Sequence, residues 1–238
     1  MKKIGLIQPN FQQGPAELNA YYLPYSIGSL WAYALTSNIV RENYELVSLQ
    51  WKREQISIAV SYLSDCDVVG FSTYVWNRNY NYALARAIKE INPKVVIIFG
   101  GPEPDITNPD IFKIHPFIDV VVKGEGEVTF TRLLESIIND SILLVSGLLV
   151  NDNLIAVNTG ESPRIDDLSI LPSPYKAGIF DALKANNPDI EWNSTLETNR
   201  GCPYMCTFCD WGSLTYNKVR KFNIDRVFTD LEWMAENK

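Results

Sequence analysis

Three cysteines stand close together near the C-terminal end of the sequence, at Cys202, Cys206 and Cys209. Their spacing is C-x3-C-x2-C, and Phe208 directly precedes the last of them. Three thiolates on one short segment can hold three corners of a cubic [4Fe–4S] cluster. The fourth iron then lacks a protein ligand, whereas clusters that only transfer electrons normally have every iron ligated by protein. The spacing therefore predicts chemistry at the cluster, with a substrate or cofactor on the open iron.

Zinc is the main alternative for the same thiolates. Structural zinc sites take four ligands, commonly from paired C-x2-C units, and the sequence contains no second pair. Asp210 could supply a fourth ligand, but it follows Cys209 directly and the geometry would be poor. Cys66 is expected to be a small buried apolar residue, and His115, the single histidine, is expected to be structural. Iron is the preferred interpretation, with zinc or a redox thiol cluster as alternatives.

The overall composition argues against several classes of partner. Lysine and arginine number 21 against 28 aspartates and glutamates, which leaves a net charge of −7. This charge disfavours nucleic acids and anionic membranes, and no segment approaches the ~18 apolar residues of a membrane span. Lys2 and Lys3 resemble the start of a signal peptide, but the apolar run after them is short and indicates a buried strand. The clustered cysteines do not resemble a secreted disulfide scaffold, so we expect a cytoplasmic protein.

The first part of the sequence alternates short apolar runs with helical patterns, which is typical of a parallel sheet covered by helices. We expect a flavodoxin-like, doubly wound α/β fold with strand order 2-1-3-4-5. The expected strands are Lys3–Gln8, Tyr44–Leu49, Val68–Ser72, Val95–Phe99 and Val120–Lys123. The expected helices are Tyr25–Asn38, Gln55–Ser64, Asn77–Ile91 and Glu127–Asn139, with a weak turn near Asp110–Ile114.

Glycine and polar residues follow several of these strands. Ligands of doubly wound sheets bind at the carboxyl ends of the strands, and glycine lets the backbone approach a ligand closely. Each loop by itself is more often a plain turn, but several on one edge favour a large flat or extended ligand. The candidate binding residues are Ser72, Thr73, Gly100, Gly101, Gly124, Glu125 and Gly126.

The remaining sequence is expected to hold a connecting region and the start of a second unit. A hairpin is expected near residues 148–157, followed by a linker with four prolines. The second unit is expected to begin with a strand at Ser194–Thr198, followed by the cysteine segment. The expected domains are residues 1–140, 141–190 and 191–238.

A helix is expected from about Ile224, with Asn223 as its N-terminal cap. Apolar residues recur along it at helical spacing, which predicts one buried face. The members of that face are expected to be Ile224, Val227, Phe228, Leu231 and Met234.

The cysteine motif with its aromatic residue resembles the C-x3-C-x-aromatic-C signature of the radical S-adenosylmethionine (SAM) superfamily. The first domain resembles the cobalamin-binding domain that precedes the radical SAM barrel in a large subgroup, often methyltransferases. The likeness spans nearly the whole chain, and the cysteine motif is its most specific part. The supporting matches are Pro24–Leu30, Asp67–Ser72, Gly100–Pro102, Asp119–Glu127 and Leu171–Tyr175.

The resemblance implies a cobalamin-binding domain followed by the first strand–helix unit of an incomplete radical SAM barrel. It implies a [4Fe–4S] cluster on Cys202, Cys206 and Cys209, with SAM and cobalamin as further cofactors and the candidate loops around cobalamin. The implied activity is methyl transfer to an unactivated carbon through a 5′-deoxyadenosyl radical. A small-molecule or lipid-like substrate and an electron donor such as flavodoxin or ferredoxin are implied with it. The catalytic residues stay unknown.

Two departures from the family pattern matter. Many cobalamin domains carry D-x-H-x-x-G after the first strand, but residues 8–19 contain no histidine, so cobalamin would be base-off without that ligand. The later strand–helix units of the barrel, with the glycine-rich SAM-binding motif, are also missing. The chain is therefore expected to be an N-terminal fragment, or half of a split enzyme whose partner chain completes the barrel. The alternative function is a non-catalytic cobalamin-binding module.

Overall fold

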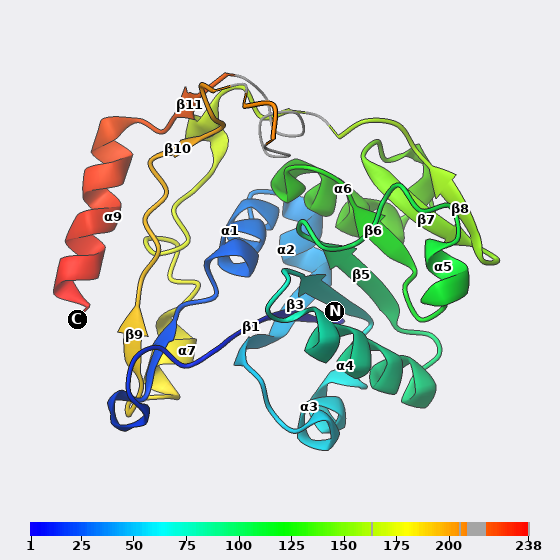
Figure 1. Cartoon of the computed structure of the whole chain (residues 1–238), viewed down its shortest axis with the longest axis horizontal. Coiled ribbons are helices and arrows are strands. Elements are labelled where there is room, and N and C mark those ends of the chain that lie inside the picture. Colours follow the sequence, from blue (N-terminus) through cyan, green and yellow to red (C-terminus); the bar gives the residue numbers. More distant parts are fainter. Residues whose placement is uncertain (163, 205, 209–217, 238) are drawn as a thin grey trace.

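The computed structural model describes residues 1–162, 164–204, 206–208 and 218–237. The strands of its main sheet are β1 (Lys2–Asn10), β3 (Tyr44–Lys52), β4 (Val68–Ser72), β5 (Val96–Gly100), β6 (Val120–Val122), β7 (Leu148–Asp152) and β8 (Ile155–Asn158). They form one seven-stranded sheet in the order β3-β1-β4-β5-β6-β7-β8 (Figure 1). The strands from β3 to β6 are parallel, and the hairpin β7–β8 extends the sheet in antiparallel fashion from β6.

The order of the first five strands confirms the doubly wound α/β fold. Numbered along the chain, the five parallel strands expected from the sequence lie in the order 2-1-3-4-5. Parallel neighbours need a crossover of a dozen or more residues, usually a helix, and the sequence alternates strands and helices at that spacing. The expected hairpin near residues 148–157 also forms, and it joins the main sheet.

Helices bury both faces of this sheet. They are α1 (Tyr25–Ala34), α2 (Asn38–Asn43), α3 (Ile56–Leu63), α4 (Arg78–Ile91), α5 (Ile111–Ile114) and α6 (Gly126–Ile138). The helices α3, α4 and α5 share one apolar core with the sheet, and α1, α2 and α6 share the other. In β5, Ile97 and Phe99 belong to the first core and Ile98 to the second, as the two-residue period of a strand requires.

One helix boundary was predicted wrongly. The helix expected over Tyr25–Asn38 ends at Ala34, and α2 begins at Asn38. The cause is Ser37, whose side-chain oxygen accepts a hydrogen bond from the Val40 amide at 3.4 Å and caps a new helix.

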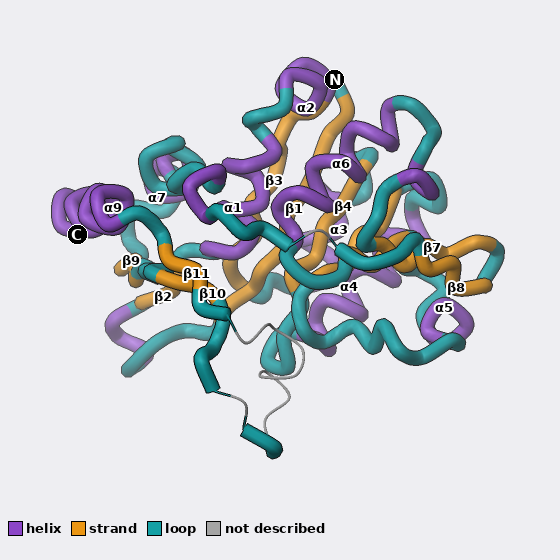
Figure 2. The backbone as a smooth tube through the Cα atoms, turned by 90° about the horizontal axis from the view of Figure 1, so that it is seen from above, coloured by secondary structure: helices purple, strands orange, loops and turns teal. Residues whose placement is uncertain are grey.

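The second unit lies beside the main sheet, on the opposite side from the hairpin β7–β8 (Figure 2). Its elements are β9 (Glu191–Asn193), β10 (Asn199–Arg200), β11 (Arg220–Lys221) and α9 (Ile224–Glu236), and the connecting region before it contains α7 (Asp181–Ala185). Short 3-10 turns are η1 (Ala16–Leu18), η2 (Ile142–Leu144) and η3 (Leu168–Ile170), and β2 (Ala20–Tyr22) pairs with β9 in parallel. The strand expected at Ser194–Thr198 was wrong: those residues join β9 to β10, and β10 pairs with β11.

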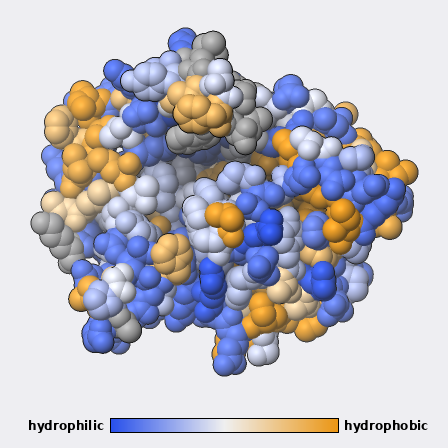
Figure 3. Space-filling model, viewed as in Figure 1, coloured by the Kyte–Doolittle hydropathy of each residue, from blue (hydrophilic) through white to orange (hydrophobic). Residues whose placement is uncertain are grey.

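The buried face of α9 also differs from the prediction. Asn223 caps the helix as expected, its side chain accepting from the Asp225 amide at 2.8 Å. Val227 is buried, as predicted, but Asp230 and Trp233 complete the buried face. The predicted core residues Ile224, Phe228 and Leu231 are 61%, 56% and 42% exposed. Hydrophobic side chains accordingly gather on the surface over α9 at the left of Figure 3.

Polar partners explain this rotation. The Asp230 carboxylate accepts a hydrogen bond from the Ser173 hydroxyl and pairs with Arg226 at 3.4 Å. Trp233 lies against Tyr175, with ring centroids 4.8 Å apart. Since a buried carboxylate needs partners, the residues near 173–175 select which face of α9 turns inward.

Candidate functional site

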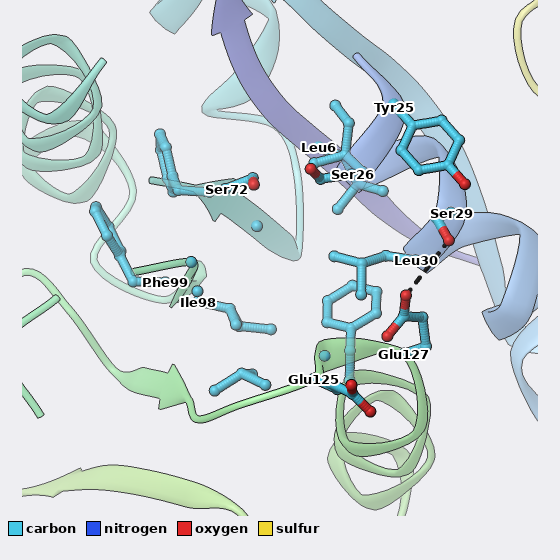
Figure 4. A pocket seen from close by; sticks show the side chains of 18 of the residues that line it. Leu6, Tyr25, Ser26, Ser29, Leu30, Ser72, Ile98, Phe99, Glu125 and Glu127 are labelled. Atoms are coloured by element: carbon cyan, nitrogen blue, oxygen red, sulfur yellow. Dashed lines mark hydrogen bonds between the residues drawn. The ribbon is translucent and has the colours of Figure 1, made fainter. Parts of the chain in front are cut away.

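A cavity of roughly 270 Å³ opens at the carboxyl ends of β4, β5 and β6. The first turns of α1 and α6 form its other wall (Figure 4). Its floor is apolar, with Leu6, Ile98, Phe99, Val122 and Phe130. Its rim is polar, with Tyr25, Ser26, Ser29, Ser72, Glu125, Glu127, Glu197 and Arg200. A pocket with an apolar floor and a few convergent polar groups is the usual form of a small-molecule site.

Most of the predicted loop residues lie on this cavity, and one does not. The residues that line it are Ser72, Gly100, Gly101, Gly124, Glu125 and Gly126. Thr73 is fully buried outside the cavity, and its hydroxyl oxygen accepts a hydrogen bond from Asn81 at 3.0 Å. Thr73 therefore supports the loop after β4.

Gly101 makes a close approach that no other residue type could make. Its φ is +93°, and a β-carbon there would lie 2.4 Å from the Thr73 carbonyl oxygen. The Thr73 amide also donates to the Gly100 carbonyl at 2.8 Å. The loops after β4 and β5 thus pack backbone against backbone, which leaves room for a ligand above them.

Two buried asparagines of the α4 region hold the same loop. Asn77 donates to the Ser72 carbonyl at 3.1 Å and accepts from the Tyr74 amide at 2.8 Å. Asn81 donates to the Ser72 carbonyl at 3.3 Å. The sequence analysis missed both. Their four-residue spacing on the helix expected after the Ser72 strand was the available signal, because it places both amides on one face.

The polar end of the cavity is built around Arg200. Its guanidinium donates to the Glu127 carboxylate at 2.6 and 3.2 Å and to the Glu197 carboxylate at 2.7 and 3.1 Å. Ser29 donates to Glu127 at 3.4 Å (Figure 4), and Tyr25 donates to Glu197 at 3.3 Å. Residues from α1, α6 and β10 therefore meet at one corner of the cavity.

Glu125 makes a second bridge at the neighbouring position of the rim. Its carboxylate accepts two hydrogen bonds from Arg220 of β11, one of them at 2.9 Å. The Ile165 amide donates to the same carboxylate at 3.1 Å. The N-cap of α6 thus contacts β11, and its first turn contacts β10.

These contacts shift the protonation equilibria of the groups. Burial acts to raise the pKa of Glu125, but the hydrogen bonds from Arg220 and the Ile165 amide outweigh it and hold the pKa below 4.5. Burial acts to lower the pKa of Arg200, but its bonds to Glu127 and Glu197 raise that pKa. Burial, helped by the charge of Glu197, raises the pKa of Tyr25. Arg200 and Glu125 therefore stay charged over the neutral pH range.

The cysteine segment leaves β10 beside this corner. Cys202 is half-buried, Cys206 is exposed, and both are free thiols. Cys209 lies outside the described residues, and within the described part no group of three metal-binding side chains assembles. The cluster ligands expected from the sequence therefore stay a prediction.

Cys66, expected to be buried, and His115, expected to be structural, do not line the cavity. Cys66 is 1% exposed, and burial raises the pKa of its thiol to about 11. His115 stacks on Tyr82, with ring centroids 4.5 Å apart, and burial lowers its pKa. No helix in the described part of the chain has the length and apolar character needed to cross a bilayer.

Residues 34–134 match the family model described as the B12 binding domain. Two curated relatives cover 92% of the chain. They are 2-(S-pantetheinyl)-carbapenam-3-carboxylate methyltransferase of Streptantibioticus cattleyicolor, 35% identical, and the cobalamin-dependent radical SAM methyltransferase TokK of Streptomyces tokunonensis, 34% identical. The chain spans only about a third of the length of each, 33%.

A solved structure shares the fold. The radical SAM methyltransferase TsrM from Kitasatospora setae, with cobalamin and a [4Fe–4S] cluster bound, superposes with a TM-score of 0.68. The match covers 99% of this chain and 46% of that chain at 16% identity. The similarity extends beyond the B12 binding domain into the second unit.

Proposed function

This chain belongs to the cobalamin-binding radical SAM proteins, and we propose that it is the N-terminal part of a cobalamin-dependent methyltransferase. The observation that carries the proposal is the joint placement of two features. The cavity opens at the loops of the B12 binding domain, and the cysteine segment starts from β10 at the rim of that cavity.

The cavity fits one part of a cobalamin. A volume of roughly 270 Å³ lies just below the range of ligand pockets, about 300 to 1,000 Å³, so the cavity would hold only part of a large cofactor. It suits a nucleotide tail, with apolar residues against the base and serines at the rim. Ser72, Gly100 and Gly101 at the edge of the cavity would hold the rest of the cofactor. With no histidine in residues 8–19, this segment offers cobalt no imidazole ligand.

The cysteines fit an iron–sulfur cluster. Cys202 and Cys206 are unpaired thiols on the described part of the motif, and Cys209 would supply the third ligand. When bound, the cluster would supply the electron that cleaves SAM, and cobalamin would deliver the methyl group. The protein positions these groups and excludes water around them. Such a cluster suits a reducing compartment such as the cytoplasm, with flavodoxin or ferredoxin as electron donor.

The chain spans about a third of the length of its two curated relatives, 33%, so we place the binding of SAM and substrate outside it. The exposed apolar residues of α9 suit a further strand–helix layer, either from the same polypeptide or from a partner chain. We propose that layer as the site of SAM and of a small-molecule substrate. A non-catalytic cobalamin-binding module is the alternative, and no specific feature of the site favours it.

Anaerobic reconstitution with iron and sulfide, followed by iron counting and cobalamin titration, tests the proposal. Wild-type protein should bind about four irons and one cobalamin. Cys206→Ala should lose the cluster and keep cobalamin, while the control Cys66→Ala, remote from the motif, should keep both. Stoichiometric zinc in place of iron would refute the cluster. Loss of both cofactors in Cys206→Ala would refute two separate sites.

A further inference from the structure

Two arginines face each other across the β10–β11 pair. Arg200 and Arg220 are register partners in these antiparallel strands. Like charges directly opposite each other destabilise a strand pair, and each strand has only two residues. Since even a full two-stranded hairpin is marginal by itself, this ribbon depends on contacts outside itself.

Those contacts come from the start of α6 in the B12 binding domain. Arg200 binds Glu127 at 2.6 Å, and Arg220 binds Glu125 through two hydrogen bonds. Glu125 is the N-cap position of α6, and Glu127 lies in its first turn. The helix dipole favours carboxylates there, so the start of α6 presents two ordered anions to the two cations of the ribbon.

Both bridges are withdrawn from solvent. The side chains of Arg200 and Glu127 are 15% and 7% exposed, and those of Arg220 and Glu125 are 4% and 16% exposed. Each arginine donates two hydrogen bonds to its carboxylate. A forked guanidinium–carboxylate pair fixes direction as well as distance. Removing one partner of a buried ion pair is also strongly destabilising, because the other charge is left buried without a partner.

The two bridges flank the cysteine motif in sequence at unequal distances. Arg200 is separated from Cys202 by Gly201 alone, and Arg220 stands eleven positions after Cys209. Arg200, Glu125 and Glu127 also line the cavity. A displacement of the start of α6 would therefore reach β10, which leads directly into Cys202, and β11 together.

We propose that Glu125–Arg220 and Glu127–Arg200 form a clamp through which the B12 binding domain positions the cysteine segment relative to the cavity. The four side chains are positioning residues and take no part in the chemistry themselves. The inference rests on the proposed function, because it concerns the distance between cluster and cobalamin. It adds that this distance is set from the start of α6, where Glu125 and Glu127 lie.

The first test uses the cofactor-free chain. Hydrogen exchange is measured in peptides that cover β10 and β11, in wild type and in Arg220→Gln. Loss of one bridge should speed exchange there by about tenfold. The matched control is Arg78→Gln, which breaks the Arg78–Glu103 bridge of 3.1 Å within the B12 binding domain. This variant should leave hydrogen exchange in β10 and β11 unchanged. Equal exchange in Arg220→Gln and wild type would overturn the clamp.

The second test measures position directly. Protein loaded with reduced cluster and cob(II)alamin is studied by pulsed electron paramagnetic resonance, which reports the distance between the two spins. Only molecules with both spins contribute, so partial loading does not distort the result. Wild type and Arg78→Gln should give one narrow distribution, and Arg220→Gln a broader or shifted one. An unchanged distribution in Arg220→Gln would overturn the positioning role.

A conservative variant guards against simple misfolding. Arg220→Lys keeps the charge but removes the forked geometry, so its distance distribution should fall between those of wild type and Arg220→Gln. A wild-type distribution in Arg220→Lys would show that charge alone suffices and would overturn the forked clamp. If wild type binds no iron or no cobalamin, the proposed function fails, and hydrogen exchange still decides whether the bridges hold the ribbon.

Discussion

Gly28 of α1 lies against the aromatic ring of Phe180. A β-carbon at Gly28 would come within 2.3 Å of the ring, and Phe180 is fully buried. The glycine therefore lets the connecting region dock onto the first domain. Phe180 belongs to a small apolar core with Leu23, Tyr175 and Trp233, which are far apart in the sequence.

Gly28→Ala should destabilise the protein by about 1–3 kcal/mol, because overpacking a closed core forces side chains out of place. The better helix propensity of alanine offsets about 1 kcal/mol of this loss. Urea unfolding measures the net effect. Adding Phe180→Leu should recover part of the loss, and a stabilised Gly28→Ala protein would contradict the close contact.

Gly101→Ala should weaken cobalamin binding by about tenfold or more and leave iron content unchanged. The new β-carbon would meet the Thr73 backbone at 2.4 Å, and the loop would have to move into the cavity. Gly160→Ala is the matched control, because Gly160 has a similar φ of +99° with nothing within 4 Å of the added carbon. Titration with hydroxocobalamin measures both variants, and equal affinities would exclude the steric argument.

Glu125→Gln should lower the free energy of unfolding by about 2 kcal/mol at neutral pH, because Arg220 loses its anionic partner. The pKa of Glu125 is lower in the folded than in the unfolded protein. Its stabilisation is therefore complete above the ordinary value of 4.5 and is lost as pH falls through the lowered folded pKa. Denaturant unfolding at several pH values should show the gap to wild type closing below about pH 4.5. A gap that stays constant down to pH 3 would refute the assignment.

Trp233→Ala should cost about 3 kcal/mol of stability, as expected for a large buried aromatic residue. Trp233 is 8% exposed and packs on Tyr175. Phe228→Ala, on the same helix, should change stability by no more than about 0.5 kcal/mol, because Phe228 is 56% exposed. Thermal unfolding of the two variants shows which face of α9 is buried. A larger loss of stability in Phe228→Ala than in Trp233→Ala would favour the face that the apolar pattern predicts.

The sheet was predictable because its signal is local. Strands such as Val68–Ser72 are buried along their whole length, so apolar runs identify them, and helices of regular period separate them. The position of the cavity followed from the same order, since carboxyl ends of parallel strands share one edge. Glycine and polar residues after those strands then marked the rim.

The contacts that join the two units were not predictable from the sequence. Glu127 and Arg200 are separated by 73 positions, and no local pattern pairs two charged residues across that distance. Thr73 was expected at the cavity because it adjoins Ser72, but the turn of the backbone buries it.

The sequence by itself determined the order of the strands and the loops that surround the cavity. Both depend on residue type and short-range spacing. Only the tertiary structure decided which face of α9 turns inward and which acids hold the arginines of β10 and β11. Those choices depend on partners such as Ser173, Tyr175 and Glu125, because the energy of a buried polar or aromatic group is set by what lies beside it.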